Sequence, residues 1–225
     1  EDEDEDEDED GSYSTTFKEK VCKLCSSYQF VAVGVAFFIC GVTTTGFLET
    51  HLVALVVQDG GMSNFIAAIA FSVLSACNGA GMILSGHLSD RMSREYLLAI
   101  IFMVRALIYL MLLLTFPTPG GMASLFVFAV IFGLVDYSVI PPTIGLVNAY
   151  VPEMVGFAVG VLLMCHSAGA AVGAAAGGWI FESASNYDWA LLGCAILCIL
   201  AGLSCISAKP ATAAGSKPSE EAAAV

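Results

Sequence analysis

The sequence predicts an all-α integral membrane protein with six transmembrane helices. Of the 225 residues, 57% are hydrophobic and only 13% are charged, whereas a soluble domain has about 25% charged residues. Six hydrophobic runs follow one another, and each is long enough to cross about 30 Å of hydrocarbon at a rise of about 1.5 Å per residue. A globular protein with a large soluble core is therefore excluded.

The six predicted spans are joined by short connections that contain turn-forming residues. The spans are Phe30–Val57, Asn64–Ser85, Leu97–Phe116, Ala123–Val147, Met154–Phe181 and Tyr187–Ile206. The first is interrupted by Thr43-Thr44-Thr45-Gly46 and the fourth by Pro141-Pro142. Breaks in a spanning helix are tolerated where the freed backbone meets protein or a water-filled cavity, so we expect both breaks to lie in such a place.

Glycines recur at four-residue spacing in the fifth span. They form Gly156-x-x-x-Gly160 and Gly169-x-x-x-Gly173-x-x-x-Gly177. Such spacing keeps one helix face small, so that another helix backbone can approach closely. Ordinary tight packing explains these glycines at least as well as a functional cavity does.

The segments that flank the spans are polar, and they define three regions of the chain. Ten of the 21 acidic residues form the run Glu1–Asp10; such a run repels itself and has nothing to bury. We expect residues 1–27 to be a disordered linker, acidic and then basic, residues 28–207 to form the six-helix domain, and residues 208–225 to be a disordered tail. The acidic run could alternatively attract a basic partner.

The basic residues predict how the chain is oriented in the membrane. Seven of the eight lysines and arginines lie in the two tails or in the turn between the second and third spans; the eighth, Arg105, lies within a span. Cytoplasmic loops carry an excess of Lys and Arg. Both tails and that turn are therefore expected on the cytoplasmic side.

The composition also bears on enzymatic and nucleic-acid functions. The sequence has no phosphate-binding glycine loop and no metal-ligand spacing, so we expect no enzyme, no metal and no cofactor. The net charge of -13 argues against nucleic-acid binding, which needs a basic surface. The eight cysteines are scattered through apolar runs, apart from Cys22-x-x-Cys25, which lacks a second Cys pair and is a weak metal or redox signal.

Three ionisable residues, Arg105, Asp136 and His166, lie at similar depth in three different spans. At a rise of about 1.5 Å per residue, Arg105 is about 16 Å past Arg94, and Asp136 and His166 are about 20 and 18 Å past Ala123 and Met154. Ionisable side chains at this depth are costly and mark solute or proton pathways. We therefore predict that these three residues bind a solute in a polar central cavity.

The chemistry of each residue suits such a cavity. Arg105 offers a planar, permanently charged fork that matches a carboxylate, and Asp136 or His166 could exchange a proton. A structural role is the open alternative, in which Arg105 and Asp136 form an ion pair between two helices and His166 is hydrogen-bonded in the packing.

A second polar pair, Glu49 and His51, lies late in the first span. A continuous helix from Phe30 would bring Glu49 about 28 Å across, near the outer mouth, and unwinding at Gly46 would leave it deeper. We predict a role in gating or proton coupling, although a wet position at the interface explains the pair equally simply.

A charged turn, residues 86–94, separates the second and third spans. It reads Gly86-His87-Leu88-Ser89-Asp90-Arg91-Met92-Ser93-Arg94 and resembles the loop signature G-x-L-x-D-R-x-G-R-[RK] of the major facilitator superfamily. The matching residues are Gly86, Leu88, Asp90, Arg91 and Arg94, while Ser93 and Glu95 depart from the signature. The resemblance implies that Asp90 faces the N-terminus of a neighbouring helix as a latch on the cytoplasmic side.

Six spans with this turn after the second are similar to the C-terminal half of a twelve-helix transporter of that superfamily. The resemblance implies two inverted three-helix repeats, the second beginning near Ala123. It also implies an N-terminal six-helix half that is missing from this chain, which begins with Glu1 and is expected to be a fragment or a domain of a longer protein.

Three further segments resemble monocarboxylate porters and oxalate:formate antiporters. They are residues 43–51, 73–83 and 132–138. Where relatives can place a substrate-binding Arg, four residues before the signature Gly, this chain has Met82, so that role does not carry over.

The resemblance implies a secondary active transporter that moves a small organic anion, such as a monocarboxylate, by alternating access. Protons are the expected coupling ion, because Asp136, His166 and Glu49 are available. The expected partners are membrane lipid, the solute, protons and the N-terminal half. The alternative is a non-transporting membrane protein of the same fold, such as a solute sensor, a scaffold or a partner half.

Overall fold

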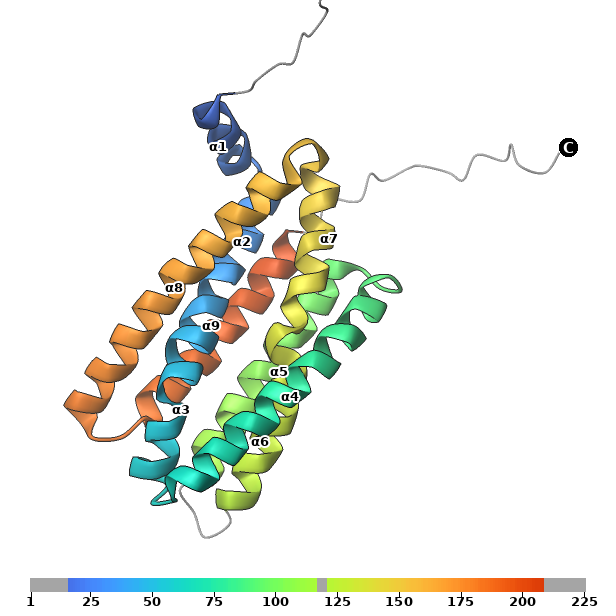
Figure 1. The fold of residues 1–225 in the computed structure, drawn as a ribbon. Coiled ribbons are helices and arrows are strands. Elements are labelled where there is room, and N and C mark those ends of the chain that lie inside the picture. Colours follow the sequence, from blue (N-terminus) through green and yellow to red (C-terminus); the bar gives the residue numbers. More distant parts are fainter. Residues whose placement is uncertain (1–15, 117–120, 209–225) are drawn as a thin grey trace, which may run out of the picture.

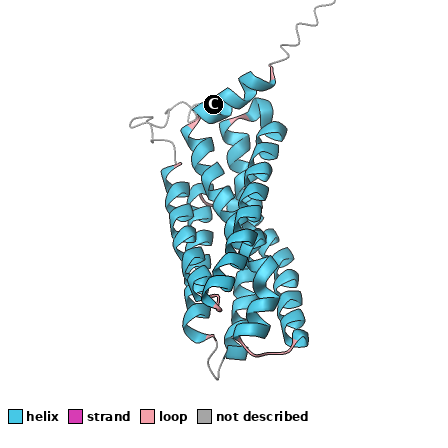
Figure 2. Cartoon of the chain, turned by 90° about the vertical axis from the view of Figure 1, so that its left-hand side faces the viewer, coloured by secondary structure: helices cyan, strands magenta, loops and turns pink. Residues whose placement is uncertain are grey.

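The computed structural model describes residues 16–116 and 121–208. The acidic run and the C-terminal segment from residue 209, for which we predict disorder, lie outside the described residues. Six helices of the described part are long and apolar enough to cross a membrane, and that part contains helices, turns and short loops but no strand (Figure 2). The predicted all-α fold with six transmembrane helices is confirmed.

The six spans are built from helices that run side by side in one elongated bundle (Figure 1). The elements are α1 (Phe17–Ser26), α2 (Tyr28–Gly41), the π-helical segment η1 (Val42–Glu49), α3 (Thr50–Ala54), the π-helical segment η2 (Leu55–Asp59), α4 (Asn64–Ser89), α5 (Arg94–Thr115), α6 (Gly121–Asp136), the 3-10 segment η3 (Tyr137–Val139), α7 (Ile140–Tyr150), the 3-10 turn η4 (Pro152–Met154), α8 (Val155–Ala184) and α9 (Asp188–Ser207). The first span comprises α2 to η2, and the fourth comprises α6 to α7. The helix pairs with the most extensive contacts are α5 with α9, α4 with α6, and α2 with α8.

Most span boundaries differ from those expected by one to four residues, and two of these differences meet at the charged turn. The second span does not end at Ser85 but continues to Ser89, and the third begins at Arg94, where Ser93 is the N-cap. A single Gly at position 86 costs only about 1 kcal/mol in a helix, which packing readily offsets. Gly86 and Leu88 are therefore helical, and the turn is confined to Asp90–Ser93.

The expected disordered linker contains a helix, α1. Its start is stabilised by a capping box, in which the Glu19 carboxylate accepts a hydrogen bond from the Thr16 backbone N–H at 2.9 Å. Leu24 on its inner face is buried among the bundle residues. The prediction of disorder is therefore wrong for residues 17–26, because a hydrophobic residue that packs on the bundle can order a polar segment.

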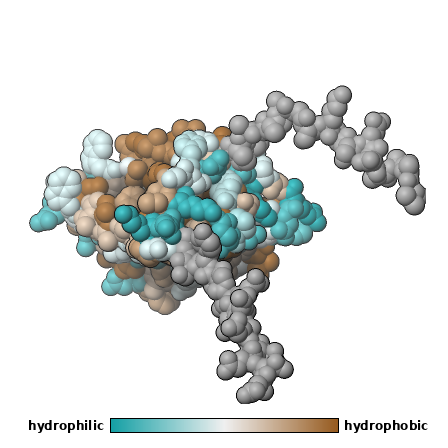
Figure 3. Space-filling view, turned by 90° about the horizontal axis from the view of Figure 1, so that it is seen from above, coloured by the Kyte–Doolittle hydropathy of each residue, from teal (hydrophilic) through white to brown (hydrophobic). Residues whose placement is uncertain are grey.

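One end of the bundle collects α1, the turn Asp90–Ser93, the α7–α8 turn and the C-terminal end of α9; we call it the tail end (Figure 1). Figure 3 looks down on this end and shows hydrophilic residues across it, with hydrophobic residues above and below them in this view. Lys23, Arg91 and Arg94 belong to elements that meet here. The tail end therefore groups the segments that the basic residues predict to be cytoplasmic, and its side of the membrane stays a prediction.

The helices differ in how much of their surface the bundle covers. In the most apolar window of each span, 67% of residues are buried in the first span, but only 28% in α4 and 17% in α8. α4 and α8 therefore keep most of their surface free for lipid or for other protein.

Candidate functional site

The fourth span is broken at η3, just before the two prolines. Pro141 and Pro142 fall in the first turn of α7, where a missing N–H is tolerated. The Ile140 N–H bonds the Tyr137 carbonyl in 3-10 geometry, so the carbonyls before the break lose their α-helical donors. The predicted break is confirmed, and the tight η3 turn leaves backbone oxygens that need donors from elsewhere.

Arg105 of α5 supplies donors to these oxygens. Its Nε and Nη2 donate to the Val135 carbonyl at 3.2 and 2.8 Å, and Nη2 also donates to the Asp136 carbonyl. The guanidinium lies beside the rings of Phe102 and Phe132, at 5.3 and 5.8 Å from their centroids. Arg105 thus links α5 to the end of α6 through the backbone.

The Asp136 carboxylate lies beside the same guanidinium. Its Oδ1 is 3.8 Å from Arg105 Nη2, and its Oδ2 accepts a hydrogen bond of 3.4 Å from Asn78 Nδ2 on α4. Arg105 and Asp136 are 0% and 1% exposed. Asp136 Oδ1 and Asn78 Oδ1 are buried without a hydrogen-bond partner, so the cluster contains acceptors that are not satisfied.

His166 joins the cluster through Cys40 of α2. Arg105 Nη1 donates to Cys40 Sγ at 3.1 Å, and the His166 side chain interacts with the same thiol from α8. The His166 ring also lies 5.8 Å from that of Phe37. Cys40 therefore connects the two predicted site residues that do not touch each other directly, Arg105 and His166.

The first span is interrupted by a wide π-helical segment, η1, whereas the fourth is interrupted by the tight 3-10 segment η3. In η1 the Thr43 and Thr44 hydroxyls donate to the Ile39 and Cys40 carbonyls at 2.9 and 2.7 Å. The Tyr109 hydroxyl of α5 donates to the Thr43 carbonyl at 2.5 Å. The predicted interruption of this span is confirmed, and its place beside Cys40 puts it next to the polar cluster.

Glycines let α8 approach this break closely. A Cβ on Gly41 would collide with the His166 carbonyl, and a Cβ on Gly173 would collide with the Val42 backbone. By contrast, a Cβ on Gly156 or Gly160 would meet nothing. The predicted close backbone approach is confirmed for the second half of α8, and it holds His166 against α2.

Glu49 and His51 point to different neighbours. Glu49 Oε1 accepts a hydrogen bond of 3.2 Å from the Tyr137 hydroxyl, at the η3 break. His51 Nε2 donates to the Ala174 carbonyl at 2.9 Å, so Nδ1 of the neutral ring is the acceptor for the Tyr187 hydroxyl at 3.2 Å. Glu49 therefore adjoins the polar cluster, whereas both ring nitrogens of His51 are used in tying α3 to α8 and to Tyr187.

Tyr187, between the last two spans, is a neutral donor in this contact. Burial raises the pKa of its phenol, and the nearby negative charge of Asp59 raises that pKa further. The Asp59 carboxylate accepts a hydrogen bond of 2.8 Å from the Tyr187 backbone N–H. The far end of the bundle is thus closed by contacts between α3, η2 and the α8–α9 loop.

The four ionisable side chains of the polar cluster differ in how exposed they are; they belong to Arg105, Asp136, His166 and Glu49. Arg105 and Asp136 are buried, whereas His166 and Glu49 are half-buried. Among the described residues, no group of His, Cys, Asp and Glu is arranged to hold a metal ion. His166 and Glu49 are therefore the more accessible members of the cluster, and the Arg105–Asp136 pair lies inside it.

The residues of the charged turn divide into two groups at the tail end. Asp90 and Arg91 are exposed, and the latch role of Asp90 stays a prediction. Arg94 lies against α7, where Nη1 donates to the Gly145 carbonyl at 3.3 Å and its chain fills the space in which a Cβ of residue 145 would sit. Its Nε is buried without a hydrogen-bond partner.

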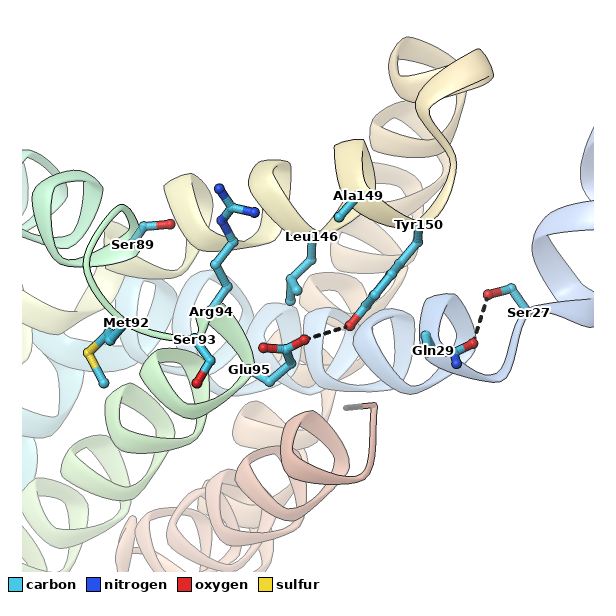
Figure 4. A pocket seen from close by; sticks show the side chains of 10 residues that line it. All are labelled: Ser27, Gln29, Ser89, Met92, Ser93, Arg94, Glu95, Leu146, Ala149 and Tyr150. Atoms are coloured by element: carbon cyan, nitrogen blue, oxygen red, sulfur yellow. Dashed lines mark hydrogen bonds between the residues drawn. The ribbon is translucent and has the colours of Figure 1, made fainter. Parts of the chain in front are cut away.

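A cavity of about 650 Å³ opens beside Arg94 (Figure 4). Its lining residues are Ser27, Gln29, Ser89, Met92, Ser93, Arg94, Glu95, Leu146, Ala149 and Tyr150. The Tyr150 hydroxyl donates to Glu95 Oε1 at 3.1 Å and lies 3.2 Å from the Ala208 carbonyl. These contacts join the ends of α5, α7 and α9, so the cavity lies where three spans are fastened together.

Several members of the polar cluster could not be assigned from the sequence. Asn78, Cys40 and Tyr137 each contact a predicted site residue. Asn78 stands out as an amide in an apolar run, which is a usable signal. In the sequence, Cys40 and Tyr137 look like ordinary packing residues of an apolar span. Their partners, Arg105 and Glu49, are 65 and 88 positions away in the chain.

Comparison with known proteins gives one match. The sequence model of the Major Facilitator Superfamily matches residues 31–225, which is most of the chain and includes all six spans apart from the first three residues of the first. No curated protein matches the chain.

Proposed function

Because the chain belongs to the Major Facilitator Superfamily, we propose that it forms one six-helix half of a secondary active transporter for a small organic anion. The family and the six membrane-spanning helices identify a membrane transporter of this kind rather than an enzyme. Alternating access, an anionic solute and proton coupling are the finer parts of the proposal, and the polar cluster around Arg105 is the observation that carries them.

The cluster supports an anion site because it places a permanent positive charge inside a membrane domain. A buried arginine is costly unless its charge is balanced and its N–H groups are bonded. Arg105 has N–H partners on Val135, Asp136 and Cys40, but its counter-ion Asp136 is 3.8 Å away. A solute carboxylate would bring a second negative charge within reach of this guanidinium.

The same cluster supports proton coupling. Asp136 Oδ1 lacks a hydrogen-bond partner, and a proton there would let the carboxyl group donate a hydrogen bond while it releases Arg105 from pairing. His166 and Glu49, the half-buried members, would pass protons and admit the solute. Proton uptake at Asp136 and anion binding at Arg105 would then favour each other, which is what symport requires.

The location of the two breaks supports alternating access. The first and fourth spans are equivalent in two three-helix repeats, and interrupted helices at equivalent positions point to the binding site of a transporter. Both breaks lie beside the cluster, because Cys40 precedes η1 and Asp136 precedes η3. Changes in either break would therefore act directly on Arg105.

The test is uptake by the full-length protein in proteoliposomes. Labelled lactate, pyruvate, formate and oxalate are offered with and without an inward proton gradient. We expect uptake of at least one of them, with stimulation by the gradient. Uptake that ignores pH would overturn proton coupling, and the absence of uptake for all four, with the protein inserted and folded, would overturn the carboxylate assignment.

Two variants test the assigned residues. Arg105→Lys keeps the charge but loses the fork, and Asp136→Asn keeps the shape but cannot exchange a proton. Loss of one charge-assisted hydrogen bond is worth about 1.5–3 kcal/mol, or about 10- to 100-fold in uptake rate. Lys18→Arg, at an exposed residue of α1 outside the cluster and the loop signature, is the matched control. Unchanged uptake in Arg105→Lys would remove Arg105 from the site.

A further inference from the structure

Helix α1 presents two exposed thiols at the tail end. Cys22 and Cys25 are exposed, whereas the other six cysteines are buried or half-buried and lie within the spans; all eight are free. The transporter proposal assigns no role to these two residues. They also stand apart chemically, since a thiol that reagents can reach is reactive in a way that a buried thiol is not.

The two thiols lie close to the start of the first span. α1 ends at Ser26, and Ser27 alone separates it from the span that begins at Tyr28. Cys25 is three residues and Cys22 six residues from Tyr28, which is at most about 9 Å along a helix. Tyr28 and Phe17 are 62% and 71% exposed, and exposed aromatic side chains of this kind sit at the level of lipid headgroups.

Contacts with the bundle hold α1 in this place. Leu24 is 1% exposed, the Lys23 ammonium forms an ion pair with Glu153, and the Phe17 ring meets that of Phe157 edge-on at 5.5 Å. These contacts fix both ends of a ten-residue helix. The two thiols are therefore held close to the start of the first span, where the membrane surface is expected.

Cys22 and Cys25 share one flank of α1 with an exposed lysine. Lys18, Cys22 and Cys25 follow the i, i+4, i+7 spacing of a single helix face. Lys23 lies at about 200° from Cys25 around the helix, toward Glu153. The flank with the thiols is therefore turned away from this ion pair, and its Lys18 can attract a phosphate group.

We propose that Cys22 and Cys25 are sites of S-acylation by a long-chain fatty acyl thioester of coenzyme A. Cysteines on membrane-proximal amphipathic helices are typical acceptors, and Lys18 would pair with the phosphates of the donor. A metal role is disfavoured, because no metal-holding cluster occurs among the described residues. The proposal rests on membrane insertion and is independent of the transported solute.

The reaction is a thioester exchange without net oxidation. The cysteine thiolate attacks the acyl carbonyl carbon, a new C–S bond forms to the protein, and the C–S bond to coenzyme A breaks. The leaving thiolate takes up the proton that the cysteine released. The attached chain inserts beside the first span and anchors α1 to the membrane surface, in addition to its contacts with the bundle.

The test uses the full-length protein produced in eukaryotic cells. Free thiols are blocked, thioesters are cleaved with neutral hydroxylamine, and each released thiol receives a maleimide polymer that shifts gel mobility. We expect up to two hydroxylamine-dependent shifts in the natural protein, fewer in C22S and in C25S, and none in C22S/C25S. The control C77S/C165S removes the two half-buried cysteines and should retain the natural pattern.

Three results would overturn the proposal. One is the absence of any hydroxylamine-dependent shift in the natural protein, and another is a shift that persists in C22S/C25S. The third is modification that a reducing agent removes and hydroxylamine does not, because that would identify a disulfide. Binding of C22S/C25S to the same membranes in equal amount verifies that this variant folds, since both side chains are exposed.

Discussion

The first and fourth spans are both interrupted near the middle of the bundle, but their interruptions are stabilised in opposite ways. η1 is a wide π-helical segment, and the hydroxyls of Thr43 and Thr44 satisfy carbonyls one turn earlier in the same span. η3 is a tight 3-10 segment whose oxygens receive donors from Arg105 of α5 and Ser85 of α4.

We call η1 the local break, because the threonines that satisfy its carbonyls belong to the same span, and η3 the shared break, because its donors come from other spans. In η1 the threonines bond carbonyls of their own span and one donor comes from outside, the Tyr109 hydroxyl of α5, whereas η3 depends on donors from two other spans, α4 and α5. The fourth span is therefore coupled to α4 and α5 through hydrogen bonds, and the first is coupled to α8 through close backbone packing at Gly41 and Gly173. Substitutions at the shared break should cost more than those at the local one.

The largest effect is expected for Arg105→Ala. This change leaves the Val135 and Asp136 carbonyls without their donor and the Asp136 carboxylate without its counter-ion. Removing one partner of a buried pair costs about 3–5 kcal/mol. The free energy of unfolding, measured by SDS titration with circular dichroism, should fall by this amount, and uptake should be lost.

The control for Arg105→Ala is Arg91→Ala at an exposed position. It should change the free energy of unfolding by less than about 0.5 kcal/mol. Equal losses in the two variants would mean that η3 does not depend on α5, and the comparison between the two breaks would fail.

A smaller loss is expected for Gly173→Ala. The new Cβ would collide with the backbone at Val42, and overpacking of this kind costs about 1–3 kcal/mol. Gly160→Ala on the same helix meets nothing and should be neutral or stabilise by up to about 1 kcal/mol. Thermal unfolding of the two variants checks the pair, and a stabilised Gly173→Ala would contradict the close approach of α8 to η1.

Ser85→Ala probes the shared break without removing a charge. The Ser85 hydroxyl donates to the Ser138 carbonyl, which cannot receive an N–H from Pro142. An unsatisfied buried acceptor costs about 1–3 kcal/mol. Ser72→Ala, an exposed serine of α4 that bonds within its own helix, should have no measurable effect on the SDS titration, and an effect equal to that of Ser85→Ala would argue against the contact.

The smallest effect is expected at the local break. Thr44→Val preserves the shape and removes a neutral hydrogen bond to the Cys40 carbonyl and a weak contact with Cys40 Sγ, and a neutral hydrogen bond is worth about 0.5–1.5 kcal/mol. Ser167→Ala, which removes an exposed hydroxyl that bonds only one turn back within α8, serves as the reference in the same titration. A loss in Thr44→Val that matches Arg105→Ala would reverse the proposed order of the two breaks.

Much of this arrangement is readable from the sequence, and the exceptions have physical causes. The spans follow from hydrophobic length, and the interruptions follow from the threonines of the first span and the prolines of the fourth. The continuation of α4 to Ser89 could not be foreseen, because Gly86 is a weak helix breaker that packing overrides. The helix α1 was missed for a similar reason, since it depends on the docking of Leu24.

The polar residues likewise divide into those that the sequence identifies and those whose role only the structure shows. Arg105, Asp136 and His166 could be singled out because each is an ionisable group at membrane depth. Their grouping depends on Cys40 and Asn78, which carry no charge and lie on other helices. Glu49 and His51 are two residues apart in the chain, yet they contact different elements.

The sequence by itself determined the number of spans, the positions of the two breaks and the depth of the ionisable residues, because all three depend on local composition and on helix rise. Only the tertiary structure decided which oxygens Arg105 bonds, that Cys40 joins it to His166, and that Glu49 rather than His51 adjoins the cluster. These contacts join residues from different spans, and their geometry is set by the packing of whole helices, which no single stretch of sequence contains.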